Sequence, residues 1–382
     1  MKIFHLSDLH IGLKLMNRDL TEDQRDIFDQ IVKKAKEEKP DAMVIAGDIY
    51  DKSIPSAEAV DLFDEFLSKL HEAMPELPVM MISGNHDSIS RVNIYRTILN
   101  KQNIHMIGRP PMTEDEFIEK VVLEDSYGKV NFYLLPFVKP SMVKGIVGVD
   151  EDGRNLSYDQ SVRKLIEREN ICQEERNVLV SHQFYNPVGS DVSEVERMDS
   201  EMRTVGNIDE VKADILERFD YAALGHIHKP MKVGSEFYRY CGTPFPCSVS
   251  EAGQVKGIIM VEMGAKGEMT TKVLPLRPLH DVRIIMDTFE NVLKEACNDY
   301  VSIVLTDEED LDVIDMQDRI RYAFPNLLEI RRQSRYQTDY RKVEREREEK
   351  DPFALCCSFL GDLSEEEKAL LEDVIHTVKE VL

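Results

Sequence analysis

The sequence predicts an α/β fold that contains a partly parallel sheet. Apolar strands alternate with amphipathic helices over residues 1–87, and each of these strands stops at a turn that carries Asp, Asn or His. Alternation of strand and helix is typical of parallel strands joined by helical crossovers. Shorter strands, in which apolar and polar residues alternate more regularly, follow in the middle of the chain.

The first 87 residues are predicted to form three buried strands and two helices. Ile3, Phe4 and Leu6 indicate a strand that begins within a few residues of the N-terminus. Apolar side chains then recur on one face of each helix, and Pro40 ends the first helix. The other elements of this part are helices over 20–39 and 56–74 and strands over 41–46 and 78–82.

Further strands and two long loops are predicted in the middle of the chain. The segments 139–163 and 185–210 lack strong periodicity, so we expect both to be loops, which are usually functional when they are long. The predicted strands lie over 129–136, 177–181, 221–224, 236–240 and 257–262, the last two antiparallel.

The charge pattern predicts domain boundaries in the last third of the chain. From Asp281 onward there are 26 acidic and 14 basic residues.

The end of the chain carries a feature of another kind. An apolar stripe near the C-terminus, from Leu370 to Leu382, is wide enough to predict docking onto a partner protein. The predicted parts are a catalytic domain over 1–277, a small α+β capping domain over 278–335, and a charged linker with a helical tail over 336–382.

Composition limits the class of protein. With 382 residues, 42% hydrophobic and 31% charged, the chain predicts a soluble protein of two or three domains. The six cysteines include no C-x-x-C pair, which favours reduced thiols and a cytoplasmic location. A net charge of −24 argues against a protein that coats nucleic acid in general. It does not exclude a nuclease, because metal ions or a partner subunit can supply positive charge.

Five predicted strands end in side chains that bind metals. Because sites in open α/β sheets lie beyond the carboxyl ends of the strands, these side chains are expected to meet in one place. The set offers nitrogen and oxygen ligands and no thiolates, and it is large enough for two metals that share a carboxylate, an arrangement suited to hydrolysis at phosphorus. Its members are Asp8, His10, Asp48, Asn85, His182, His226 and His228.

Each of these residues has a structural alternative when it is taken alone. A single Gly-Asp is most often a turn, and His182 by itself would more often be a core or surface histidine than a ligand. Coincidence becomes a poor explanation only when all five strand ends are taken together. The remaining histidines lack such a context and are interpreted as structural: His5, His71, His105, His280 and His376.

The motifs around these residues resemble those of a known family. Asp8-Leu9-His10, Gly47-Asp48, Gly84-Asn85-His86-Asp87 and Gly225-His226-Ile227-His228 are similar to the motifs of calcineurin-like metallophosphoesterases. This resemblance spans residues 1 to about 270 and implies a sandwich of two sheets flanked by helices. Within the family, segments 224–230 and 240–244 resemble the SbcD group of nuclease subunits, whose members also carry a Ser-x-x-Glu-like turn such as Ser248 to Glu251.

The resemblance also implies roles for individual residues. Asp8, His10, Asp48 and His228 would hold one Mn²⁺, and Asp48, Asn85, His182 and His226 the second, so that Asp48 bridges; Mg²⁺ is an alternative metal. His86 would be the catalytic histidine that faces the scissile phosphate. Asp87 would fix an imidazole. Asp51 stands where archaeal and eukaryotic relatives have a second functional histidine, which favours a bacterial member of the group.

The function implied by the resemblance is that of a DNA nuclease subunit. It would cut double-stranded DNA ends and hairpins in DNA repair, recombination and replication, together with a coiled-coil ATPase of the SbcC type. The core would form a homodimer through the helices after the second and third strands, where the apolar stripe from Val60 to Leu70 is wide. Two alternatives stay open: a small-molecule phosphodiesterase on the same fold, which the appended C-terminal residues disfavour, and a non-catalytic scaffold, which the complete ligand set disfavours.

Overall fold

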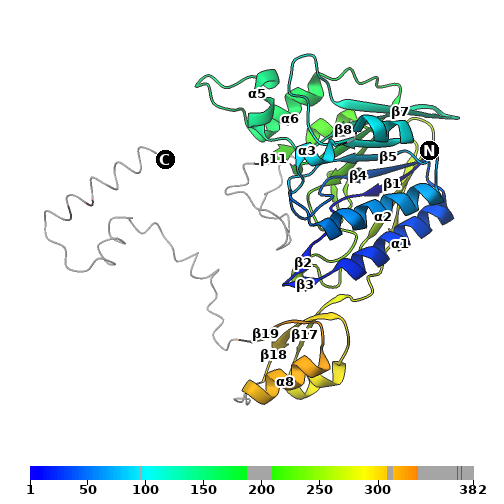
Figure 1. Cartoon of the computed structure of the whole chain (residues 1–382). Helices are drawn as coiled ribbons and strands as arrows, with labels where there is room; N and C mark the ends of the chain where they lie inside the picture. Colours follow the sequence, from blue (N-terminus) through cyan, green and yellow to red (C-terminus); the bar gives the residue numbers. More distant parts are fainter. Residues whose placement is uncertain (95, 187–208, 308–312, 334–367, 369–370, 372–382) are drawn as a thin grey trace. The chain divides into compact units, whose positions relative to one another are not determined.

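Two six-stranded sheets packed face to face form most of the described structure (Figure 1). The computed structural model describes residues 1–94, 96–186, 209–307 and 313–333, together with Lys368 and Leu371. Helices cover the outer face of each sheet. The predicted α/β fold with two sheets and flanking helices is therefore confirmed, whereas the predicted helical tail lies almost entirely outside the described residues.

The first sheet is built on a parallel core. Its strand order is β16-β15-β1-β4-β5-β6, in which the four strands from β1 to β6 are parallel and β15 and β16 are antiparallel additions at one edge. The strands are β1 (Lys2–Leu6), β4 (Ala42–Ala46), β5 (Val79–Ile82), β6 (Ile104–Ile107), β15 (Gly257–Met263) and β16 (Met269–Pro275).

The second sheet repeats this plan, with the order β13-β14-β12-β9-β8-β7. Its four central strands are parallel, and an antiparallel strand closes each edge. The strand predicted over 236–240 is β14, which pairs with β12 in parallel and does not lie in the same sheet as β15, so the expected antiparallel relation was wrong. The strands are β7 (Glu119–Asp125), β8 (Gly128–Leu135), β9 (Arg176–His182), β12 (Tyr221–Gly225), β13 (Met231–Val233) and β14 (Ser235–Tyr240).

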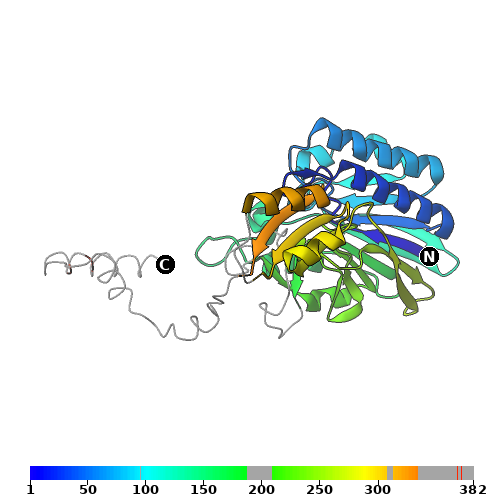
Figure 2. The same ribbon diagram turned by 90° about the horizontal axis from the view of Figure 1, so that it is seen from below.

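Two pairs of helices cover the sandwich. Helices α1 (Thr21–Glu38) and α2 (Ala57–Ala73) lie side by side over the first sheet (Figures 1 and 2). Helices α5 (Pro140–Val147) and α6 (Tyr158–Glu167) pack on the second sheet. The prediction of a loop over 139–163 was wrong. Helix α5 is only two turns long, which leaves little periodicity to detect, and α6 starts at a capping box formed by Ser157 and Gln160.

Short elements complete the body of the molecule. The strands β10 and β11 pair in parallel at the two ends of the second predicted loop, of which residues 187–208 lie outside the described structure. These elements are β2 (Lys14–Leu15), β3 (Arg18–Asp19), α3 (Ile89–Val92), α4 (Arg96–Leu99), β10 (Phe184–Asn186) and β11 (Glu210–Lys212), with 3-10 turns η1 (Asn100–Gln102), η4 (Ala213–Arg218) and η5 (Val249–Glu251).

The apolar stripe of α2 covers the chain's own core. Phe63, Phe66 and Leu70 are buried, and Leu67 packs partly buried against them. Val60 is 44% exposed. Most of the stripe predicted to form a dimer interface is thus used within one chain.

A small three-stranded sheet follows the sandwich. It has the order β17-β18-β19 and carries its own apolar core, which includes Ile303, Ile320 and Phe324. Residues 1–331 nevertheless form one compact unit, and the domain boundaries near 277 and 335 stay predictions. The elements are β17 (Val282–Asp287), α7 (Phe289–Val292), η6 (Leu293–Glu295), β18 (Tyr300–Leu305), α8 (Val313–Ala323) and β19 (Leu327–Arg332). Among the described residues, no helix is both long enough and apolar enough to cross a membrane.

Candidate metal centre

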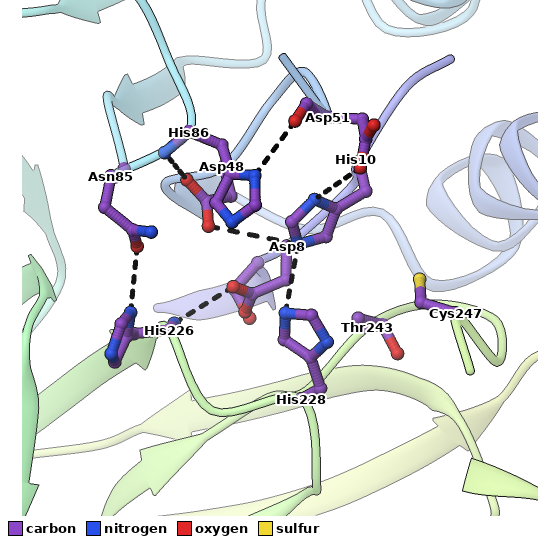
Figure 3. A network of polar contacts seen from close by, with 12 residues as sticks. Asp8, His10, Asp48, Asp51, Asn85, His86, His226, His228, Thr243 and Cys247 are labelled. Atoms are coloured by element: carbon purple, nitrogen blue, oxygen red, sulfur yellow. Dashed lines mark hydrogen bonds and ion pairs between the residues drawn. The ribbon is translucent and has the colours of Figure 1, made fainter. Parts of the chain in front are cut away.

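The predicted ligand residues meet at the carboxyl ends of five parallel strands. The first sheet contributes the residues after β1, β4 and β5, and the second sheet those at the ends of β9 and β12. Figure 3 shows the residues that follow β1, β4, β5 and β12. The apolar segments that predicted these strands are buried between the sheets or under the helices, which fixes where each strand ends. All eight predicted side chains are brought together: Asp8, His10, Asp48, Asn85, His86, His182, His226 and His228.

Backbone in the left-handed region aims several of these side chains. Asp8, His10 and Asp48 have φ angles of 53°, 41° and 49°, and His226 has a φ of 103°. Such angles are uncommon for residues other than glycine and cluster at functional sites. Hydrogen bonds from Asp8 N to Gly47 O and from His10 N to Asp48 O, both 3.0 Å, join the turns after β1 and β4. The two turns therefore hold each other in place.

Asp48 occupies the middle of the cluster. Its Oδ1 accepts a hydrogen bond from His86 N at 2.9 Å, and its Oδ2 lies 3.2 Å from His182 Nε2 and 3.9 Å from His10 Nε2. The second oxygen of Asp48 thus faces imidazoles from both sheets, and Asp48 lies between two groups of the predicted ligand residues.

One group of the predicted ligand residues surrounds the Asn85 side chain. Asn85 Oδ1 lies 3.0 Å from His182 Nε2 and 2.9 Å from His226 Nδ1. The other nitrogen of His182 lies 2.7 Å from Ala46 O, which fixes the ring. His226 and His182 also contact each other edge to face, with ring centroids 5.3 Å apart.

A second group is formed by Asp8, His10 and His228. The Nε2 atoms of His10 and His228 are 3.0 Å apart, about the separation of two nitrogens that share one metal at right angles, each about 2.1 Å from it. Asp8 Oδ1 accepts a hydrogen bond from His226 N at 3.0 Å, whereas Asp8 Oδ2 and His10 Nδ1 are buried without a hydrogen-bond partner. A buried carboxylate oxygen is rarely left in this state, so Asp8 Oδ2 together with the two facing imidazole nitrogens fits a cation.

Glycines make room for this crowded arrangement. A Cβ atom on Gly84 would collide with the Asp48 side chain, and one on Gly225 would collide with Ala46 O. Gly47 has a φ of 89°, and a Cβ there would collide with the His182 ring. The glycines before Asp48, Asn85 and His226 therefore allow close packing at the site.

Electrostatics within the cluster favour the protonation state of a metal ligand at Asp48 and His10, and the protonated form at His182. Burial opposes charge on Asp48, but the nearby histidines, His182 first, hold its pKa well below the usual range. Burial lowers the pKa of His10, and the His228 imidazole lowers it further. Burial also acts to lower the pKa of His182, but the Asp48 carboxylate raises it to about 9. Metal coordination requires ionised carboxylates and neutral imidazoles, which Asp48 and His10 provide.

His86 lies at the more open side of the cluster. Its side chain is partly exposed, its Nδ1 lies 2.9 Å from Asp51 O, and its ring meets the His10 ring edge to face at 4.9 Å. Its ring can also reach the space that Asp48 and His10 face. A partly exposed imidazole that is fixed through one nitrogen leaves the other nitrogen for a bound group.

Comparison with known proteins identifies the family. A profile described as calcineurin-like phosphoesterase matches residues 1–230. The chain belongs to the calcineurin-like phosphoesterase family. This family implies divalent metal ions, and three groups of described residues could hold them, with ligand atoms within 4.8 Å of one another in each: Asp8, His10 and His228; His10, Asp48 and His86; Asp8, Asp48 and His182.

Individual relatives include a nuclease and two solved structures. The SbcD subunit of the nuclease SbcCD of Staphylococcus epidermidis is 29% identical over 337 residues, which cover 86% of this chain and 85% of the relative. The crystal structure of TT1561 from Thermus thermophilus is 12% identical, covers 71% of this chain and 98% of its own, and has a TM-score of 0.39. The crystal structure of a dimetal phosphatase from Danio rerio is 12% identical. It covers 72% of this chain and 98% of its own, and has a TM-score of 0.41.

The role predicted for Asp87 in this phosphoesterase was wrong. Its carboxylate accepts hydrogen bonds from the backbone N–H groups of Ile49, Tyr50 and Gly84, at 2.9–3.0 Å, and not from an imidazole. Asp87 thereby connects the turn after β4 with the turn after β5. Sequence could not show this, because the partners are backbone amides and two of them, those of Ile49 and Tyr50, belong to a turn that is remote in the chain.

Sequence reasoning missed two charged residues of the phosphoesterase site. Glu251 and Lys256 are buried beside His228 and form an ion pair of 2.7 Å. The Ser-x-x-Glu-like turn was the available signal, and the structure explains it: Ser248 Oγ donates to Glu251 Oε1 at 3.0 Å. Nothing in the sequence around Lys256 indicates that it forms an ion pair with Glu251.

Proposed function

We propose that this phosphoesterase is a metal-dependent DNA nuclease, the nuclease subunit of a complex with an ATPase. The observation that carries the proposal is the convergence of six residues with nitrogen or oxygen ligand atoms around Asp48, beside a partly exposed His86. A complete ligand set favours catalysis over a scaffold role. The relative named as a nuclease subunit, which is similar over most of both chains, favours DNA over a small phosphodiester as substrate.

Two divalent ions, Mn²⁺ or alternatively Mg²⁺, would be held by overlapping sets of residues. Asp8, His10, Asp48 and His228 would form one set, in accordance with the 3.0 Å approach of His10 to His228. Asp48, Asn85, His182 and His226 would form the other, in accordance with the position of Asn85 Oδ1 between two imidazoles. When bound, such ions supply positive charge beside a phosphodiester and activate water for attack at phosphorus.

His86 would act on the substrate and not on the ions. Its Nδ1 is engaged by Asp51 O, so the ring is oriented before substrate binds. Since Nδ1 donates to that carbonyl oxygen, the ring must be an imidazolium for Nε2 to act as a donor. In that form Nε2 would donate a hydrogen bond to a phosphate oxygen or pass its proton to the leaving 3′-oxygen. Asp51 itself lies with Oδ1 3.7 Å from His10 Nδ1, where it would orient the His10 ring.

The metal and substrate proposals are tested together with purified protein. We expect Mn²⁺-dependent cutting of a DNA hairpin that exceeds turnover of a chromogenic phosphodiester, with both activities abolished in Asp48→Ala. A matched control is Asp125→Asn, which removes a carboxylate that pairs with Arg176 in the second sheet away from the site. Turnover of the chromogenic ester without DNA cutting would instead favour the small-molecule phosphodiesterase.

The partner would be a coiled-coil ATPase of the SbcC type, in a cytoplasmic assembly that contains two copies of each chain and acts in DNA repair and recombination. We expect the ATPase to co-purify with the full-length chain and to be lost after truncation behind Lys350, while Mn²⁺-dependent endonuclease activity is retained. The docking residues predicted over 336–382 lie almost entirely outside the described residues. Unfolding of the truncated chain would show that this segment belongs to the catalytic fold.

A further inference from the structure

A buried ion pair lies directly behind His228. Glu251 is fully buried and Lys256 is 2% exposed. Lys256 Nζ contacts Glu251 Oε2 at 2.7 Å and also donates a hydrogen bond to the backbone oxygen of His228 at 2.9 Å. On the other side of the pair, Glu251 Oε1 lies 3.7 Å from His228 Nδ1. The pair therefore approaches both the backbone and the ring of one proposed ligand.

Stability of the fold is a poor explanation for this pair. Removing two charges from water is unfavourable, and well-packed apolar residues of similar volume often replace a buried ion pair without loss of stability. Both Glu251 oxygens are nevertheless fully engaged, since Ser248 Oγ donates to Oε1 at 3.0 Å and Thr243 Oγ1 donates to Oε2 at 2.9 Å. So many directional contacts fix the carboxylate in one position.

The position of the carboxylate determines which nitrogen of His228 can bind a metal. A negative charge beside Nδ1 favours the tautomer that carries its proton on Nδ1. The lone pair is then on Nε2, the atom that lies 3.0 Å from His10 Nε2 at the centre of the cluster. The backbone of His228 is held as well, because Thr243 N donates to its carbonyl oxygen at 3.2 Å in addition to Lys256 (Figure 3 places Thr243 beside His228).

We propose that Glu251 and Lys256 are positioning residues for His228. Glu251 sets the tautomer and the orientation of the ring, and Lys256 neutralises the carboxylate and anchors the backbone of the ligand. This inference rests on the metal roles proposed above. It assigns a function to two residues that need not touch the ions or the substrate.

Mn²⁺ binding by Glu251→Gln tests the proposal without an activity assay. Free Mn²⁺ is followed by electron paramagnetic resonance during titration of wild type and of the variant, and folding is followed by thermal unfolding. We expect one of two ions to bind roughly 10- to 100-fold more weakly, the usual effect of removing a group that orients a metal ligand. The other ion, on the side of Asn85, should keep its affinity.

Asp125→Asn is the matched control. It breaks another ion pair that involves a buried group, Arg176, so it should lower thermal stability while Mn²⁺ binds as in wild type. If Glu251→Gln does not fold, the double variant Glu251→Gln with Lys256→Gln decides the question, because it leaves no unpaired buried charge. The proposal predicts that the folded double variant also binds one ion more weakly.

Unchanged affinity for both ions in a folded Glu251 variant overturns this inference alone. Wild-type protein that binds no Mn²⁺ overturns the metal roles, and this inference with them. The two failures are therefore distinguished by the wild-type titration.

Discussion

The two sheets contribute to the candidate centre in different ways. The first sheet supplies all the predicted oxygen ligands, Asp8, Asp48 and Asn85, from turns beyond the strand ends. The second sheet supplies imidazoles alone among the predicted ligands, and one of them, His182, still belongs to a regular strand, where it pairs with Gly225. The negative charge of the proposed ligand set thus comes from one sheet, while the other sheet closes the centre with imidazoles.

Because of this difference, we expect the two sheets to affect metal binding at the site in different ways. In the proposed centre, carboxylates of the first sheet would balance the charge of the ions, and the turns that carry them hydrogen-bond to one another. Left-handed backbone occurs on both sides, at Asp8, His10 and Asp48 and also at His226. Residues of the second sheet add coordination and depend on close contact between the sheets, which the glycines permit. Substitutions on the two sides should therefore have effects of different kind and size.

The largest effect on metal content and activity is expected for Asp48→Ala, and it should exceed the effect of His182→Ala. Asp48 faces ligands from both sheets, so its loss should remove both ions and lower nuclease activity by more than the roughly 10²- to 10³-fold that follows removal of one electrostatic group. His182→Ala should lose one ion. Metal content by mass spectrometry of native protein checks both outcomes. Two ions retained in Asp48→Ala would contradict the bridging assignment.

A smaller effect is expected for His86→Gln, in the turn after β5. His86 is oriented by Asp51 O but is proposed to act on substrate, so Mn²⁺ content should stay at two ions while the rate of cleavage falls by roughly 10²- to 10⁴-fold. The measurement is single-turnover cleavage of a DNA hairpin at saturating Mn²⁺. If an ion is lost instead, His86 is a ligand, as its position near His10 and Asp48 would also allow.

The sequence predicted the location of the eight residues because the signals that place them are local. Asp8, Asp48 and Asn85 each follow a short apolar run, and such runs are buried strands whose carboxyl ends meet when the strands are parallel. Local signals do not show which strands share a sheet. The runs that became β4 and β9 are similar in character, yet they lie in different sheets.

Long-range contacts of polar groups could not be predicted. Asp87 binds backbone amides almost 40 residues away, and Glu251 reaches His228 through a turn whose course depends on the complete fold. The short helix α5 was missed for another reason. Its eight residues are stabilised by packing on the second sheet and provide too few turns for a periodic pattern.

Gly225→Ala should reveal how closely the sheets approach each other. A Cβ atom on Gly225 would collide with Ala46 O, a backbone atom that cannot turn away. We expect the free energy of unfolding to fall by about 3 kcal/mol, at the upper end of the usual range for overpacking, and Mn²⁺ affinity to fall as well. Chemical denaturation provides the measurement.

Gly145→Ala is the control for this substitution. Gly145 lies on the exposed side of α5, where a Cβ atom meets only ordinary contacts. Alanine there should raise the free energy of unfolding by about 0.5–1 kcal/mol, as expected for glycine in a helix. Equal losses in the two variants would show that the sheets are not in tight contact at Gly225.

The last prediction concerns how the stability of the fold depends on pH through His5. This residue connects the two sheets by hydrogen bonds and is not one of the proposed ligands. His5 of β1 is buried, with Nδ1 2.9 Å from Tyr221 Oη and Nε2 3.3 Å from Leu224 O in β12. Burial lowers its pKa to about 3 from the ordinary value of 6.5. As the pH falls below 6.5, the unfolded chain takes up a proton at this residue and the folded chain does not. The stability of the fold should therefore decrease as the pH falls from 6.5 towards 3.

Comparison with His5→Gln isolates this contribution, because all other titrating groups are shared by the two proteins. Between pH 7 and pH 5 the wild type should lose about 2 kcal/mol more of its free energy of unfolding than the variant. The measurement is urea denaturation at a series of pH values. Parallel curves would mean that His5 is protonated as easily in the folded chain as in the unfolded chain. The contact between β1 and β12 would then be open to water, and the second sheet could not hold its imidazoles at fixed distances from Asp8 and Asp48.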